Sequence, residues 1–378
     1  MMKILHLFPD DAKFLGYAKD FFLLPQIENT WFVIGNREDE KLPLYPNHFE
    51  SYDSIFDAHN LEVFQTLIEQ HDLWFIHYFD SRLIPVVNRF ASQKPLIIQL
   101  WGGDYARFTY STPSLIEEET YRITIHANSK TKYLPIGLSR LYHRLKWKLG
   151  QGKRAYFSSM SRASEIWTLL HEEEVNLFKN WPDLSFSEHK VIYGEFSEEE
   201  ISVGQGIPKI LLGNSGNSSN NHLEVIQLLN PLKEQFDHCY LPMSYAGTDE
   251  YRKDLAQSIP SNIYSQVSIL QEMMPKETYF RLVNECDVII MNHIRQQALG
   301  NILYGLCRGK TIYLNPKGVL WKYFFNRGYA IKKTSNLRKQ GLQKVSLKEA
   351  QLNQRLVLRS WSRSENAVLI HLQNAVKG

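Results

Sequence analysis

The sequence predicts an α/β protein made of two doubly wound, parallel-sheet domains, and three observations lead to this prediction. Short apolar segments alternate with segments of helical periodicity through both halves of the chain. The 378 residues are enough for two domains rather than one. Residues 186–206 separate the two alternations, because they combine glutamates and glycines with few large apolar side chains.

The first domain is predicted over residues 1–190. Its apolar segments are short, which is typical of buried strands in a parallel sheet. Strands are predicted at Lys3–Phe8, Thr30–Gly35, Leu73–Tyr78, Pro95–Leu100 and Ala155–Met160. Helices are predicted at Tyr17–Leu24, Asn60–Gln70 and Leu83–Phe90, and a further helix is predicted to begin at Ser164.

The second domain is predicted over residues 207–340 and shows the same alternation. The polar, helical segment 345–378 is predicted to pack back on the N-terminal domain. Strands are predicted at Lys209–Leu212, Cys239–Ser244, Val267–Leu270, Asp287–Met291 and Thr311–Leu314. Helices are predicted at Asn221–Leu229, Glu250–Ser258 and Lys276–Asn284.

Composition excludes several classes of function. A net charge of only +3 argues against a nucleic-acid partner. The three cysteines lack the spacing of metal ligands, which favours buried thiols in a reducing cytoplasm. The N-terminus reads as a strand rather than a signal peptide, and no apolar run approaches the roughly 18 residues that span a bilayer.

Two strand–loop–helix stretches organise the predicted chemistry. In KILLGNSGNSSNNH and NHIRQQALGN, a buried strand runs into a loop of small and amide residues before a helix begins. Backbone N–H groups at such a helix start, together with Arg295, favour a diphosphate. A polar turn and a salt-bridged arginine are the ordinary alternatives. The predicted binding residues are Gly213, Asn214, Ser215, Asn220, Asn221, His222, Arg295, Gln296, Gln297, Gly300 and Asn301.

Two further residues at strand ends suit the rest of a nucleotide. Tyr245 follows Cys239–Ser244 and has a ring that can stack on a base. Glu272 follows Val267–Leu270 and can accept hydrogen bonds from ribose hydroxyls. An ordinary turn aromatic and a solvated carboxylate are the alternatives at these two positions.

Acidic residues and one histidine lie at the strand ends of the first domain. Asp10, Asp11, His77 and Asp104 all have side chains that can take a proton from a hydroxyl group. Asp104, Asp10 and Asp11 are the predicted catalytic residues, and helix capping is the alternative role for each. The sequence shows no metal-ligand motif, so no metal and no cofactor are expected. A leaving diphosphate would then be stabilised by Arg295, backbone N–H groups and helix dipoles.

A basic segment, Lys130–Arg154, carries eight Lys or Arg residues and no Asp or Glu. Leucines recur in it at helical spacing beside Trp147. A basic amphipathic helix with a tryptophan is typical of a surface that binds anionic membranes. The alternative is a solvated helix that packs its apolar face on its own domain.

The segments LLGNSGNSSNNH, IRQQALGN and WGGDY resemble a known family, the TDP-4-acetamido-4,6-dideoxygalactose (Fuc4NAc):lipid II transferases of enterobacterial common antigen synthesis. The resemblance runs from about Lys3 to Asn326. It implies a metal-independent GT-B glycosyltransferase whose two Rossmann-like domains face across a cleft, peripheral on the cytoplasmic face of the inner membrane. It further implies a TDP-sugar donor on the second domain and a polyprenyl-diphosphate-linked acceptor on the first, near Asp104.

The sequence therefore predicts a glycosyltransferase that moves a deoxyamino sugar from a TDP-sugar to a lipid-linked oligosaccharide. A GT-B-shaped nucleotide-sugar epimerase is one alternative, and it would need no lipid acceptor. A non-catalytic subunit that binds a nucleotide or a glycan is another, and it would show no turnover.

Overall fold

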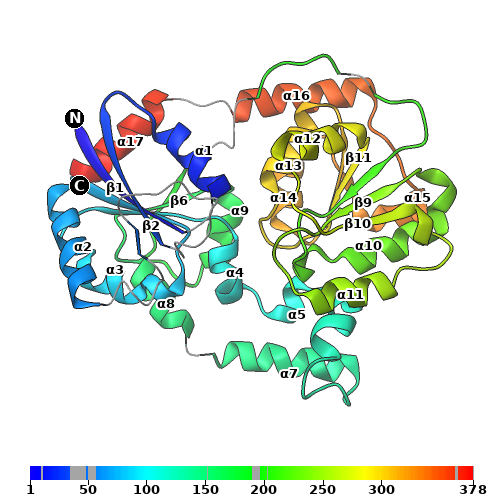
Figure 1. The fold of residues 1–378 in the computed structure, drawn as a ribbon, viewed down its shortest axis with the longest axis horizontal. Helices are drawn as coiled ribbons and strands as arrows, with labels where there is room; N and C mark the ends of the chain where they lie inside the picture. The colour runs from blue at the N-terminus through cyan, green and yellow to red at the C-terminus, as the bar shows by residue number, and fades with distance from the viewer. Residues whose placement is uncertain are drawn as a thin grey trace. The chain divides into compact units, whose positions relative to one another are not determined.

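The computed structural model of the chain describes residues 1–9, 12–34, 48–49, 57–150, 152–189, 196–201, 203–361 and 365–377. The chain divides into two compact units (Figure 1). The first unit comprises Met1–Thr109, Gly150–Glu195 and Arg363–Gly378. The second comprises Tyr110–Leu149 and Phe196–Ser362.

The first unit is built on a parallel sheet of seven described strands in the order β3-β2-β1-β4-β5-β6-β7. Every residue of β4 and β5 is buried, as expected for strands with helices on both faces. The alternating apolar pattern therefore predicted a parallel sheet here and located β1, β2, β4 and β5, whereas β3, β6 and β7 were not predicted. The strands are β1 (Met2–Pro9), β2 (Ile27–Ile34), β3 (His48–Phe49), β4 (Leu73–His77), β5 (Leu96–Gln99), β6 (Glu165–Thr168) and β7 (Phe186–Glu188).

Helices pack on both faces of this sheet (Figure 1). On one face, Leu5 and Trp74 of the sheet join a large buried cluster with Phe64 and Phe90 of the helices. On the other face, α1 buries Leu15 and other residues against β1 and β2. The helices of this unit are α1 (Ala12–Phe22), α2 (Ala58–Gln70), α3 (Ile84–Phe90), α4 (Gly103–Thr109), α8 (Gly152–Met160), α9 (His171–Val175) and α17 (Glu365–Lys377).

The predicted strand Ala155–Met160 is wrong, because these residues form most of helix α8. Tyr156, Phe157 and Met160 are buried at positions i, i+1 and i+4, which is the spacing of one helical face. A short apolar run does not distinguish a strand from a buried helical segment. The strand is β6 instead, at the point where the sequence predicted a helix from Ser164.

The second unit is built on a parallel sheet of six described strands in the order β10-β9-β8-β11-β12-β13. All five predicted strands are present, and β13 was not predicted. The strands are β8 (Ile210–Leu212), β9 (Cys239–Pro242), β10 (Val267–Leu270), β11 (Val288–Met291), β12 (Thr311–Leu314) and β13 (Lys332–Lys333). The helices are α10 (His222–Leu229), α11 (Asp249–Gln257), α12 (Lys276–Glu285), α13 (Leu299–Cys307), α14 (Val319–Asn326), α15 (Leu337–Gln340) and α16 (Leu347–Ser360).

The segment Tyr110–Leu149 lies in the second unit, although the predicted first domain included it. It contains α5 (Thr112–Leu115), α6 (Glu118–Tyr121) and α7 (Ile136–Lys148). The Glu224 carboxylate on α10 accepts hydrogen bonds from Thr120 N at 2.9 Å and Thr120 Oγ1 at 2.5 Å. These bonds join residues far apart in the sequence, so no local pattern could have predicted them.

The predicted C-terminal segment 345–378 is also divided between the units. Only α17 belongs to the first unit, where Leu372 is fully buried. Helix α16 belongs to the second unit, and its buried Asn353 bonds the backbone of Ala330. Asn353 Oδ1 accepts from Ala330 N at 2.7 Å, and Nδ2 donates to Ala330 O at 3.0 Å. Across the described ranges, none of the helices has the length and hydrophobicity to cross a membrane.

Replacing Asn353 with Ala should lower the free energy of unfolding by about 2–3 kcal/mol, because it removes both hydrogen bonds of a buried side chain and leaves the N–H and C=O of the partly buried Ala330 without these partners. Chemical denaturation of the full chain measures this loss. Gln351→Ala is the matched control, since Gln351 is exposed on the same helix and its replacement should change stability by less than about 0.5 kcal/mol. Equal effects of the two substitutions would contradict the role assigned to Asn353.

Candidate functional site

Strand order places the candidate site at one edge of the second sheet. The chain runs outward from β8 through β9 to β10 and then returns to β11 on the other side of β8. Ligands of such sheets bind outside the carboxyl ends of the strands where the order reverses. β8 and β11 pair directly, with Ile290 opposite Leu212, so the loops that follow them begin side by side. These are the two loops that the sequence singled out.

The conformation of the loop after β8 is fixed by a glycine and by hydrogen bonds within the loop. Gly213 has a φ of +71°, and a Cβ there would lie 2.5 Å from His222 Nε2, so only glycine fits. The fully buried Asn220 then bonds the loop to itself. Its Oδ1 accepts from Asn214 N at 3.2 Å, and its Nδ2 donates to Ser215 O at 3.1 Å. Asn220 therefore shapes the loop, and its side chain is largely occupied by that role.

Gln297 joins the two loops. Its Nε2 donates to Asn214 Oδ1 at 2.9 Å, and its Oε1 accepts from Ser219 Oγ at 2.9 Å. Nε2 also lies 3.5 Å from Ser215 Oγ. Loops separated by about eighty residues in the sequence therefore form one polar surface, as the diphosphate hypothesis requires.

Asn221 has a structural role that the sequence did not indicate. It has a left-handed backbone (φ +53°) at the start of α10, and its side chain does not cap that helix. Its Oδ1 accepts from Glu117 N at 2.8 Å, while its Nδ2 donates to Leu115 O and Asn292 O, each at 3.1 Å. The side chain thus holds both loops and the segment 110–149 together.

Several buried polar atoms beside these loops have no hydrogen-bond partner among the described residues. They are His222 Nε2, both ring nitrogens of His293, and Gln296 Oε1. Burial lowers the pKa of His222 to about 3. Burial also lowers the pKa of His293 well below its usual range, and the nearby charge of Arg295 lowers that pKa further. Both rings are therefore neutral near pH 7. Unpartnered buried groups are rare in native proteins, and such groups fit a place where a polar ligand binds.

Arg295 is partly exposed in the loop after β11, and its Nη1 donates to Gln296 O at 3.1 Å. Helix α13 begins two residues after Gln297, behind Ala298, which has a left-handed backbone. Gly300 lies in the first turn of α13. Asn301 faces α12 instead of the loop, because its Nδ2 donates to Tyr279 OH at 2.8 Å.

Tyr245 borders the same surface. Its hydroxyl accepts from Asn214 Nδ2 at 2.7 Å, and its side chain is 42% exposed. The loop after β9 is pressed against the loop after β8, since a Cβ on Gly247 would lie 1.8 Å from Gly216 O. Glu272 is exposed in the loop after β10, and its neighbour Met273 contacts Ser244 at 3.8 Å. Glu272 is therefore at the same sheet edge, beyond Tyr245.

In the first unit, Asp104 is only 5% exposed at the start of α4. Its carboxylate accepts from Trp101 N at 3.2 Å, Tyr105 N at 3.2 Å and Phe79 N at 3.3 Å. It thereby ties the ends of β4 and β5 together. Burial raises the pKa of Asp104 to about 7. The negative charge of Glu174 also raises this pKa, whereas the hydrogen bonds from backbone N–H groups lower it. Asp104 is thus a group that exchanges a proton near neutral pH.

The other acid–base candidates of the first unit have different positions. His77 is buried at the end of β4, where its Nε2 lies 3.0 Å from His6 Nδ1 and burial lowers its pKa well below the usual range. Asp10 and Asp11 lie outside the described residues.

Among the described residues, one cluster has the makings of a metal site, and it lies in the first unit. Glu165, His189 and His371 place a potential ligand atom each within 4.8 Å of one another. The loops after β8 and β11 offer no such cluster within the described ranges.

Sequence reasoning missed two residues of the second unit. His293 is the second residue after β11, inside the stretch already singled out, and its position could have indicated it. Glu117 could not have been found this way, because its bonds to Asn292 Nδ2 and Lys317 Nζ, both at 3.0 Å, span more than 170 residues.

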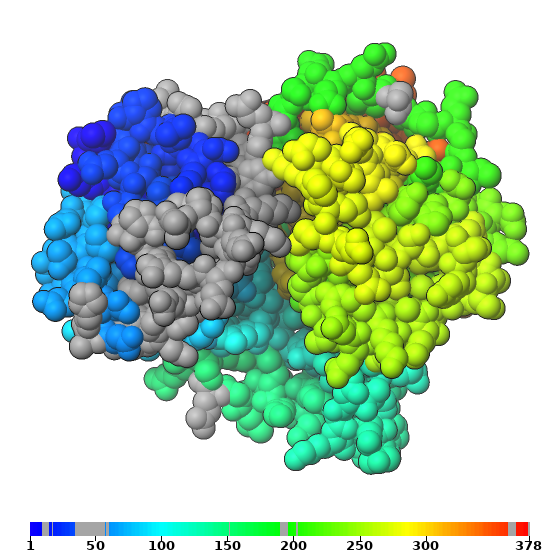
Figure 2. Space-filling view, viewed as in Figure 1, coloured from blue at the N-terminus to red at the C-terminus, as the bar shows by residue number. Residues whose placement is uncertain are grey.

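Helix α7 keeps its apolar side chains at the surface. Of its residues only Ser139 is buried, and Ser139 bonds Tyr121 and Thr131. Leu138, Leu141, Tyr142, Leu145 and Leu149 are all between 45% and 81% exposed. Figure 2 shows the teal-coloured segment that contains α7 at the surface of the face drawn. The alternative in which α7 packs its apolar face on its own domain is therefore wrong.

Two kinds of comparison relate this chain to known proteins. Residues 194–356, which include both loops, match the family model described as 4-alpha-L-fucosyltransferase, glycosyl transferase group 56. Similar solved structures share the fold across the whole chain at low identity. A glycosyltransferase from Rickettsia africae has 13% identity and a TM-score of 0.62, covering 100% of this chain and 98% of its own.

Two further structures are similar over nearly all of both chains. A sucrose-phosphate synthase from Thermosynechococcus elongatus has 10% identity and a TM-score of 0.64, covering 99% of this chain and 98% of its own. An alpha,alpha-trehalose-phosphate synthase (UDP-forming) from Burkholderia xenovorans, solved with glucose-6-phosphate, has 10% identity and a TM-score of 0.57, covering 100% of each chain. These structures have the GT-B fold. The chain thus has the GT-B fold of a glycosyltransferase, and its residues 194–356 are similar to the group 56 fucosyltransferases.

Proposed function

We propose that this glycosyltransferase moves a deoxyamino sugar of the Fuc4NAc type from a TDP-sugar to a polyprenyl-diphosphate-linked oligosaccharide in bacterial surface polysaccharide synthesis. The observation that carries the proposal is the polar surface formed by the loops after β8 and β11, which Gln297 joins at the point where the strand order reverses. The transferase family matched by residues 194–356 favours sugar transfer over an epimerase or a non-catalytic subunit.

The chemistry of this surface suits a nucleoside diphosphate. Glycine and small polar residues let the backbone approach a phosphate closely, and the N-terminal ends of α10 and α13 favour negative charge. Arg295 adds a cation, while His222, His293 and Gln296 add buried polar atoms that a donor can pair. Tyr245, whose hydroxyl accepts a hydrogen bond from Asn214 on the same surface, is our candidate to stack on the base. Glu272 is our candidate for the ribose hydroxyls.

In the proposed reaction, the bond between the sugar C1 and the diphosphate oxygen breaks, and an acceptor hydroxyl forms the new bond to C1. The electron pair leaves with the diphosphate, whose growing charge the N–H and guanidinium donors stabilise. The hydroxyl proton passes to a carboxylate of the first unit. We propose that these protein donors replace a divalent ion at the diphosphate.

Arg295→Ala should lower kcat/KM for the donor by roughly 30- to 1000-fold, because the loss of a charged contact to the leaving diphosphate costs about 2–4 kcal/mol. Arg295→Lys should recover only part of this loss, since it keeps the charge and loses the planar fork. Steady-state kinetics with a TDP-sugar and extracted lipid-linked acceptor measure both variants.

Arg281→Ala is the matched control, because Arg281 is exposed on α12 and bonds Thr278. It should have wild-type kinetics. Added Mg²⁺ should neither raise wild-type turnover nor rescue Arg295→Ala. Wild-type kinetics of Arg295→Ala would refute the proposed diphosphate contact, and rescue by Mg²⁺ would refute the ion-free leaving group.

Asp104, Asp10 and Asp11 remain the candidates for the catalytic base, and we propose Asp104 first. A base is most effective when its pKa is near the working pH, and burial raises the pKa of Asp104 to about 7. A base must be ionised to act, so the rate should rise with pH through about 7.

Asp104→Asn should remove this ascending limb and lower kcat by roughly 100- to 10,000-fold.

The raised pKa also means that Asp104 favours the folded state most below pH 3.8, and that this contribution falls as the pH rises through about 7. The thermal unfolding temperature of Asp104→Asn, relative to that of the wild type, should therefore rise between pH 4 and pH 7. The control is Asp80→Asn, since Asp80 bonds Arg82 and has a lowered pKa. An ascending limb that persists in Asp104→Asn would assign the base to Asp10 or Asp11 instead.

We further propose that α7 binds the enzyme to the cytoplasmic face of the inner membrane, where a polyprenyl-linked acceptor is held. Its leucines are exposed next to Arg144, Lys146 and Lys148, in a segment without acidic residues. Exposed apolar side chains beside clustered cations fit an anionic lipid surface both in polarity and in charge.

Replacing Arg144, Lys146 and Lys148 with Glu should release the protein from anionic liposomes, because each cation near such a surface contributes about 1 kcal/mol. Flotation with phosphatidylglycerol vesicles measures the bound fraction. A control with Lys253, Arg281 and Lys339 replaced by Glu has the same change in net charge at exposed positions outside α7. It should bind about as well as the wild type. If both triple variants bind equally, a local membrane surface on α7 is ruled out.

A further inference from the structure

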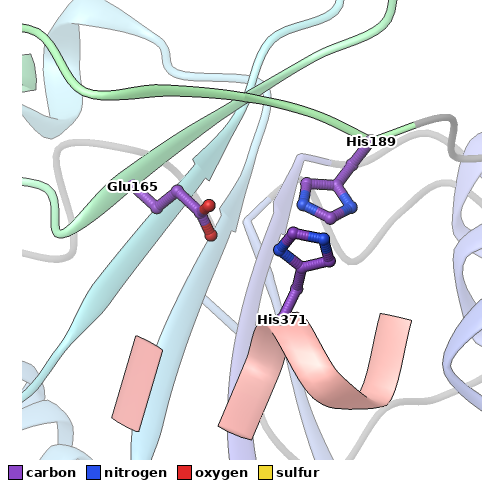
Figure 3. Close-up of side chains that lie close together, drawn as sticks. All are labelled: Glu165, His189 and His371. Atoms are coloured by element: carbon purple, nitrogen blue, oxygen red, sulfur yellow. The ribbon is translucent and has the colours of Figure 1, made fainter. Parts of the chain in front are cut away.

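A cluster of two imidazoles and one carboxylate lies in the first unit and has no role in the proposed reaction. Glu165 begins β6, His189 directly follows β7, and His371 lies on α17. One ligand atom from each lies within 4.8 Å of the others. Figure 3 shows the carboxylate of Glu165 pointing toward the two rings, with the ring of His371 next to that of His189.

His189 of this cluster is held in place by ring contacts and has a buried nitrogen that can bind a ligand. His189 is only 6% exposed, and its Nε2 has no hydrogen-bond partner among the described residues. Its ring stacks on Trp167 with the centroids 3.8 Å apart and meets the ring of His371 edge-on at 4.2 Å. The ring is thus held in place while one of its nitrogens is unused. Such a nitrogen, buried beside a carboxylate, is costly unless something binds it.

The carboxylate is held in a similar way. Trp167 Nε1 donates to Glu165 Oε2 at 2.8 Å, and Ser187 Oγ donates to Glu165 Oε1. Metal-binding carboxylates are commonly oriented by such outer hydrogen bonds, which leave further lone pairs for the ion. Trp167 therefore supports two members of the cluster at once, since it stacks on His189 and bonds Glu165.

Two imidazoles and a carboxylate are ligands typical of Zn²⁺, with bonds of about 2.0–2.2 Å. At tetrahedral angles, ligand atoms bound this way are about 3.4 Å apart. The three side chains are within 4.8 Å of one another, so an ion requires shifts of about an ångström. Movement of this size lies within the reach of side-chain rotations, without displacement of a strand or helix.

We propose that Glu165, His189 and His371 bind a Zn²⁺ ion that ties the C-terminal helix α17 to β6 and β7, with water as a fourth ligand. The preceding helix, α16, belongs to the second unit, so the chain re-enters the first unit just before α17. The ion fastens this returning helix to the sheet. This inference is independent of the proposed sugar transfer.

The test uses the full chain, stripped of metal by a chelator and titrated with ZnCl₂ in the presence of a competing chromogenic chelator. The wild type should bind one Zn²⁺ per chain at this site, and the ion should raise its thermal unfolding temperature. Glu165→Gln and His371→Gln should each weaken binding at least tenfold and lose the thermal shift. His371→Gln keeps a polar side chain on α17 and so tests the ligand rather than the helix.

His238→Ala is the control, because His238 lies in the second unit and bonds Ser268. It should bind Zn²⁺ as the wild type does. Co²⁺ in place of Zn²⁺ should give visible absorption of a four-coordinate site in the wild type and not in His371→Gln. The proposal is overturned if the wild type fails to compete with the chelator, or if Glu165→Gln and His371→Gln bind Zn²⁺ as tightly as the wild type.

Discussion

The second unit depends most on Asn221, a single buried side chain that bonds three separate parts of the chain. It accepts from Glu117 N and donates to Leu115 O and Asn292 O. Its left-handed backbone turns the loop after β8 into α10. Any shift of this residue would move both loops of the donor surface and the segment that ends in α7. The proposed donor site and the proposed membrane surface would therefore both depend on this one connection inside the second unit.

The polar groups of the candidate site divide into two kinds. Asn220, Asn221 and Gln297 are engaged with the protein and fix the shape of the loops. His222, His293 and Gln296 hold buried polar atoms with no partner among the described residues. Unpaired buried atoms that gather at one sheet edge, in a fold whose other polar groups are paired, indicate a functional site. The first kind builds the surface, and the second is what a donor would meet.

Features that depend on neighbouring residues could be predicted from the sequence, and features that depend on contacts between distant residues could not. Strands such as β11 were predictable because each is a short apolar run before a polar loop. Residues Ala155–Met160 were wrongly predicted as a strand, because a short apolar run also fits one face of a helix. The assignment of Tyr110–Leu149 to the second unit was not predictable, since it depends on bonds such as Thr120–Glu224. The Glu165–His189–His371 cluster is likewise assembled only by the fold.

The central claim is that the loops after β8 and β11 bind the donor diphosphate. A crystal structure of the full chain with thymidine diphosphate tests it most directly. The account predicts both phosphates against Gly213–Ser219 and the Arg295–Gln297 loop, with the thymine ring beside Tyr245. Phosphates bound to the first unit, or to the second unit away from both loops, would contradict it.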